Sequence, residues 1–132
     1  MAKFVEGQGH AMKIYRYVLE QGAEVELYSV DKPDQEWDGL AGMLERSLEH
    51  EKTVTQSVND LMDVAVEARD HATQIFLHWF VTEQIEEEAT VGDLIARLKL
   101  VGGKDEGLYL MDNELEAIAA KMNAASSAKS TA

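Results

Sequence analysis

The 132-residue sequence contains no cysteine, only one proline and nine glycines. Without cysteine it can form neither a disulfide nor a thiolate metal site, so its stability must come from packing. The scarcity of helix breakers favours long helices. The lack of cysteine also fits a reducing compartment, and no N-terminal stretch combines basic residues with a long apolar run. We therefore expect a cytoplasmic protein.

Basic residues are also scarce, because 12 Lys and Arg stand against 25 Asp and Glu, for a formal net charge of -13. This charge makes nucleic acids and anionic membranes poor partners and cations better ones. No uninterrupted apolar segment approaches the roughly 20 residues that cross a bilayer. We expect neither a nucleic-acid partner nor a membrane span.

The first part of the chain predicts a helix followed by a long connection. Apolar residues at helical spacing favour an amphipathic helix over residues 4–21, which Gly22 ends. Residues 22–36 include the only proline, Pro33, and are expected to be extended. About 15 extended residues reach roughly 50 Å, the length of a long helix. The flanking helices could therefore lie parallel, joined by a crossover of the kind found in some four-helix bundles.

Two longer helices are predicted over residues 37–67 and 70–100, each with an inward-facing stripe at helical spacing, which in the second of them alternates strictly between four and three. The first stripe comprises Leu40, Leu44, Val54, Val58, Leu61 and Ala65, and the second comprises Thr73, Leu77, Phe80, Gln84, Glu87, Val91, Leu94 and Leu98. Gly102 and Gly103 end the third helix, and a short helix is expected over 108–122. The prediction is one all-α domain over residues 1–122, with a disordered small and polar tail at 123–132.

Polar residues interrupt the core stripes. Gln84 and Glu87 occupy consecutive core positions of the third helix, and Glu51 lies on the inward stripe of the second. Burial of an ionised carboxylate costs several kcal/mol unless a cation or a donor compensates for it. In the first helix, His10 lies one turn from Glu6. Oxygen ligands with one imidazole form a credible metal site and favour iron or manganese over structural zinc.

A simpler interpretation of these residues is also open. Glu51 and Glu87 could lie in water at the edges of their stripes, and His10 could be a hydrogen-bonded histidine between helices. The acidic run over residues 83–88 is of a kind that usually forms a solvated face. Its register nevertheless places part of it inward, where a bound cation would relieve the repulsion between Glu83, Glu86 and Glu87.

The sequence resembles the prokaryotic non-haem ferritins, within the ferritin-like diiron carboxylate proteins. The similarity covers His10 to about Leu115, through His50 and Glu51, residues 73–88 and residues 102–115, and the segment 79–88 is the most specific part. The resemblance implies a ferritin-like four-helix bundle with a long crossover loop and a short C-terminal helix. It also implies a ferroxidase, in which a dinuclear iron centre oxidises Fe(II) with dioxygen or peroxide, and a homo-oligomeric shell of twenty-four subunits that stores ferric iron.

Site residues follow from the resemblance position by position. His10 matches the histidine ligand of the first iron, Glu51 a carboxylate of the third bundle helix, and Gln84 and Glu87 the ligands of the fourth. A third iron position is matched by further carboxylates, which would pass iron toward the cavity: Glu6, Glu83 and Glu86, together with Glu87.

Two departures from the family pattern affect the expected activity. Gly7 stands where the family has a bridging carboxylate, and no segment matches the first bundle helix, so an N-terminally shortened chain is expected. A dinuclear site without these ligands would hold iron weakly. The alternative is a non-enzymatic helical subunit that co-assembles with intact ferritin chains. A rubrerythrin-like peroxidase is disfavoured, because no histidine lies three residues after Glu87.

Overall fold

A computed structural model describes residues 2–31, 38–102, 109, 111–113 and 115–117. The chain divides into two compact units, Met1–Asp34 with Asp105–Ala132, and Gln35–Lys104. The prediction of an all-α fold is confirmed. Within the described part of the chain, no helix is long and apolar enough to cross a membrane.

The first unit contains helix α1, Ala2–Glu20, which begins two residues before the predicted start at residue 4. The helix ends in a hydrogen-bonded cap, because Gly22 N donates to Leu19 O at 2.9 Å and Ala23 N donates to Val18 O at 3.1 Å. Gly22 has a φ of 75°, a left-handed conformation that this cap requires and that glycine adopts without a steric penalty. Residues 23–31 form neither helix nor strand, as predicted for an extended connection.

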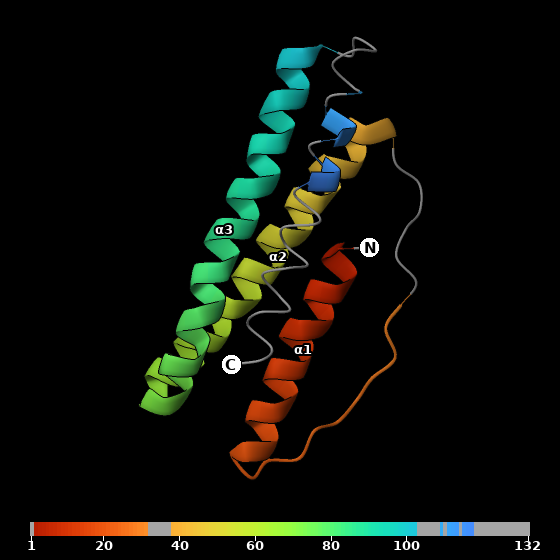
Figure 1. Ribbon diagram of the computed structural model, residues 1–132. Coiled ribbons are helices and arrows are strands. Elements are labelled where there is room, and N and C mark those ends of the chain that lie inside the picture. The colour runs from red at the N-terminus through yellow and green to blue at the C-terminus, as the bar shows by residue number, and fades with distance from the viewer. Residues whose placement is uncertain (1, 32–37, 103–108, 110, 114, 118–132) are drawn as a thin grey trace. The chain divides into compact units, whose positions relative to one another are not determined.

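The second unit is an antiparallel pair of long helices, α2, Gly39–Glu67, and α3, His71–Val101, which lie side by side in Figure 1. The predicted bounds differ only at the ends. Asp70 caps α3 instead of forming its first turn, and α3 continues to Val101 before Gly102 ends it at a φ of 63°. The second helix was predicted to begin at residue 37, which lies outside the described residues, and α2 begins at Gly39.

The turn between α2 and α3 is set by main-chain hydrogen bonds and one side-chain cap. Asp70 N donates to Ala65 O at 2.9 Å and Arg69 N donates to Val66 O at 3.0 Å, with Arg69 left-handed at a φ of 55°. Asp70 then accepts a hydrogen bond from Thr73 N at 3.0 Å and a second one from the Thr73 hydroxyl. Because the three-residue link closes in this way, the two helices must fold back on each other.

The Asp70 cap makes stability depend on pH. The Thr73 hydroxyl, and next the Thr73 main-chain N–H, lower the pKa of the exposed Asp70 carboxyl. The charged form thus stabilises the folded state at neutral pH, and this contribution is lost as the pH falls through the lowered pKa. Asp70→Asn is expected to reduce the midpoint of urea unfolding at pH 7, and the difference should vanish in acid.

The control for this experiment is Asp93→Asn, which alters an exposed aspartate within α3. It should leave a much smaller difference at pH 7. A wild-type advantage over Asp70→Asn that stays constant down to the acid transition would contradict the role assigned to the charged cap.

The α2–α3 interface has an apolar core near the turn. Val58, Ala65, Leu77 and Phe80 are buried together, with Met62 and Trp79 packed against them. The rings of Trp79 and Phe80 meet edge to face at a centroid distance of 4.8 Å, a favourable geometry for aromatic pairs. This core anchors the helix pair at the end next to the turn.

The predicted stripe of α3 is confirmed in its central part, because all six of its positions from Leu77 to Leu94 are buried. The stripe of α2 is wrong at Leu61, which is 51% exposed, while its neighbour Met62 contacts the core. The buried residues Leu44, Glu51, Val58 and Ala65 keep a strict seven-residue repeat along α2. The second row of the stripe lies four residues after Val58, at Met62, instead of three residues after it.

The remaining helix prediction can be compared only in part. Of the expected helix over 108–122, the described residues 109, 111–113 and 115–117 are helical. The tail at 123–132 lies outside the described residues. Two further predictions concern the arrangement of the two units relative to each other, and both stay predictions. They are the crossover between parallel helices and the single domain over residues 1–122.

Candidate metal centre

The middle of the α2–α3 interface is polar although it is buried. Glu51 on α2 is 9% exposed, and Gln84 and Glu87 on α3 are 3% and 6% exposed. One heptad away in both directions the interface is apolar again, with Leu44 and Val91 on one side and Val58 and Leu77 on the other. The interpretation that Glu51 and Glu87 lie in water at the stripe edges is therefore wrong.

Gln84 joins the two helices across this polar layer. Its Nε2 donates to the main-chain oxygen of Glu51 at 3.1 Å, and lies 3.3 Å from both Glu51 Oε2 and Thr55 Oγ1. The amide compensates part of the desolvation of the Glu51 carboxylate. Among the described residues, no buried side-chain nitrogen or oxygen lacks a hydrogen-bond partner.

Two further residues of this network were missed by the sequence analysis. The Thr55 hydroxyl donates to Glu88 Oε1 at 2.6 Å, and the same Thr55 oxygen lies against Gln84 Nε2. Thr55 follows Glu51 by four residues and Glu88 follows Gln84 by four, so each lies one turn further along the same helix. That spacing was the available signal, but it does not reveal that the two residues meet.

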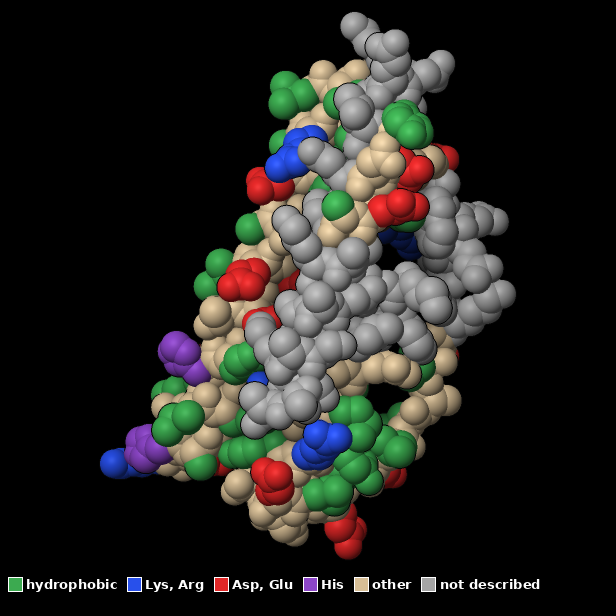
Figure 2. Space-filling model, viewed as in Figure 1, with side chains coloured by type: hydrophobic (Ala, Val, Ile, Leu, Met, Phe, Trp, Pro, Cys, Tyr) green, Lys and Arg blue, Asp and Glu red, His purple; other side chains and the backbone are tan. Residues whose placement is uncertain are grey.

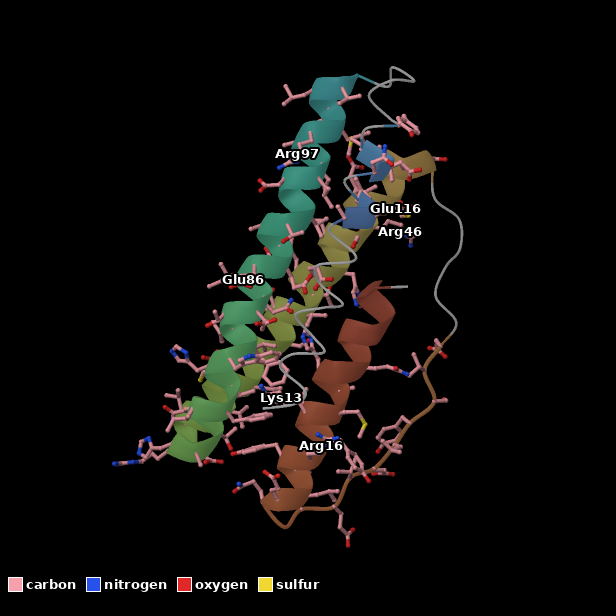
Figure 3. The ribbon with its side chains drawn as sticks, viewed as in Figure 1. Lys13, Arg16, Arg46, Glu86, Arg97 and Glu116 are labelled. Carbon is pink, nitrogen blue, oxygen red and sulfur yellow. The ribbon has the colours of Figure 1, made fainter. Side chains whose placement is uncertain are left out.

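The rest of the acidic run is divided between the interface and the surface. Glu83 is half-buried, whereas Glu86 is exposed and points away from α2 in Figure 3. Figure 2 shows further acidic side chains, together with histidine, on the outer side of α3. His50, His71 and His78 are all exposed.

The remaining predicted ligands, Glu6 and His10, belong to the unit that contains α1. His10 is half-buried on α1. Glu6 and Gly7 also lie within α1, although the Glu6 side chain lies outside the described part. No group of three or more His, Asp or Glu side chains in ligating arrangement occurs within the described side chains. The full ligand set predicted from the sequence therefore stays a prediction.

The buried polar side chains of the α2–α3 interface are of the types that hard cations prefer as ligands. Two buried carboxylates and the oxygen of a carboxamide supply the donors that Fe(II), Mn(II) or Mg(II) prefer. A cation would also offset the cost of keeping Glu51 and Glu87 ionised away from water. Fold and interior together define an all-α protein with a carboxylate-rich helix interface.

The chain belongs to the family described as the Ferritin-like domain, which it matches over residues 2–101. It is 38% identical over 114 residues to a bacterial non-heme ferritin of Campylobacter jejuni, covering 86% of this chain and 68% of that protein. It is 33% identical over 113 residues to the bacterial non-heme ferritin of an Escherichia coli O6:H1 strain, again covering 86% and 68%.

Solved archaeal structures show the same similarity. An open pore ferritin from Archaeoglobus fulgidus superposes with a TM-score of 0.79 at 42% identity, over 80% of this chain and 65% of that chain. A form of the Archaeoglobus fulgidus ferritin engineered to be closed gives a TM-score of 0.84 at 39% identity, over 86% and 70%. The chain thus spans about two thirds of the length of these relatives.

Proposed function

We propose that this chain takes part in ferritin-type iron handling, with Fe(II) as the substrate, oxidation at a dinuclear carboxylate site and storage of the ferric product. The observation that carries the proposal is the burial of Glu51, Gln84 and Glu87 within the α2–α3 interface. Their burial has no advantage for packing, since apolar residues of similar size would stabilise the interface more. A bound cation gives a reason for it.

In this proposal, the carboxylates of Glu51 and Glu87 bind iron, Gln84 contributes its amide oxygen, and His10 is the imidazole ligand. Each Fe(II) releases one electron, so a pair supplies the two electrons that, with two protons from the solvent, reduce dioxygen to hydrogen peroxide or hydrogen peroxide to two water molecules. Glu6, Glu83 and Glu86, with Glu87, form the proposed third iron position. The exposed Glu86 suits a transit role, because a surface carboxylate exchanges its cation readily.

A homo-oligomeric shell is part of the same proposal, since the relatives are ferritins. Because these relatives are named as ferritins, the similarity does not favour the alternative of a non-enzymatic subunit. Gly7 remains the main reason to expect weak binding, because glycine has no side chain with which to bridge two irons.

The test is anaerobic titration of the purified chain with Fe(II), followed by exposure to oxygen and combined with size-exclusion chromatography. We expect saturable binding, approaching about two irons per chain, and oxidation faster than in buffer within a large assembly. Negligible binding, or oxidation no faster than in buffer, would contradict the proposed function.

A further inference from the structure

The orientation of the Gln84 amide is determined by the three oxygens that lie within hydrogen-bonding distance of its Nε2. Glu51 accepts hydrogen bonds from the amide at a main-chain oxygen 3.1 Å away and at a carboxylate oxygen 3.3 Å away. The third neighbour, Thr55 Oγ1 at 3.3 Å, is a hydroxyl and can either donate or accept. The role of Thr55 therefore depends on where its proton lies.

Glu88 determines the position of that proton. The Thr55 hydroxyl has a single proton and donates it to Glu88 Oε1 at 2.6 Å, a short bond of the charge-assisted kind. Thr55 can then offer only lone pairs to Gln84. A reversed amide would place Gln84 Oε1 against three acceptors, so only the orientation with Nε2 toward α2 is favourable.

We propose that Thr55 and Glu88 are positioning residues, which hold Nε2 of Gln84 toward α2 and so leave Oε1 as the atom available to a metal. The inference rests on the proposed function, in which Gln84 is a ligand. It goes further because neither Thr55 nor Glu88 ligates the metal in that proposal. When the Glu51 carboxylate turns to bind a cation, the Glu51 main-chain oxygen and Thr55 would be the acceptors that still hold the amide.

The test compares Thr55→Val, which keeps the shape but removes the hydroxyl, with Thr55→Ser, which restores it. Thr53→Val is the matched control, because Thr53 is exposed and its hydroxyl donates to the carbonyl of Glu49 in its own helix. Anaerobic Fe(II) binding should weaken roughly tenfold in Thr55→Val and stay near the original value in Thr55→Ser and Thr53→Val. Glu88→Ala, which frees the Thr55 proton, should weaken binding in the same direction.

Crystal structures of the metal-free variants supply a readout that does not depend on iron. We expect Gln84 to turn away from α2 or to adopt more than one conformation in Thr55→Val and Glu88→Ala, and to keep its position in Thr55→Ser. An unchanged Gln84 in both of the first two variants would overturn the inference, as would unchanged Fe(II) affinity. If the unsubstituted chain binds no Fe(II), the proposed function fails, and the Gln84 conformation alone decides whether Thr55 and Glu88 position it.

Discussion

Replacing Glu51 with glutamine is expected to weaken anaerobic Fe(II) binding about a hundredfold while leaving the protein at least as stable. Glutamine has nearly the same shape and keeps an oxygen that can accept the hydrogen bond from Gln84 Nε2. It removes the negative charge that attracts the cation. Because Glu51 is 9% exposed, the same change removes the cost of burying that charge.

Two measurements on one variant check this expectation, Fe(II) titration under anaerobic conditions and urea unfolding of the metal-free protein. Glu49→Gln is the control, because Glu49 is an exposed glutamate on the same helix. It should change neither quantity appreciably. Iron binding by Glu51→Gln within about twofold of the original would show that Glu51 is not a ligand, whatever its effect on stability.

Gly7→Glu is expected to strengthen Fe(II) binding by about tenfold or more and to accelerate oxidation, because it supplies a carboxylate where the family resemblance places the bridging ligand. A carboxylate shared by two irons screens their mutual repulsion, which glycine cannot do. The variant should also gain roughly 1 kcal/mol of stability, since glycine is a poor residue within a helix such as α1.

Gly7→Ala separates these two effects, because alanine improves the helix propensity and adds no ligand. We expect Gly7→Ala to unfold at higher urea concentration with unchanged iron binding, and Gly7→Glu to combine greater stability with tighter binding. If both variants bind iron equally, the carboxylate at position 7 does not reach the metal and the position-by-position match fails there.

Glu51 and Gly7 differ in how each affects the stability of the chain and the binding of iron. In the proposed function, the buried Glu51 carboxylate would cost stability in the metal-free chain and would become favourable on binding a cation. Gly7 contributes neither to iron binding nor to stability, since it offers no ligand and weakens its helix. Metal binding should therefore raise the unfolding midpoint of Gly7→Glu more than that of the original chain.

Several features follow from the sequence by itself. Heptad spacing predicted that Gln84 and Glu87 face inward on α3, and both are buried. This succeeds because the face of a helix on which a side chain lies depends only on local periodicity. The ends of α1 and α3 follow as well, because Gly22 and Gly102 adopt the left-handed conformation that closes each helix.

Only the tertiary structure decides which side chains meet across the interface. Thr55 and Glu88 are 33 residues apart, and their contact depends on the axial register of α2 against α3, which the Asp70 turn sets. The burial of Met62 in place of Leu61 has a similar origin. Both residues follow Val58 by about one helical turn, and only the packing against α3 decides which of them is buried. The sequence thus determined which faces are buried, and the packing of α2 on α3 determined that the Gln84 amide is held from both helices.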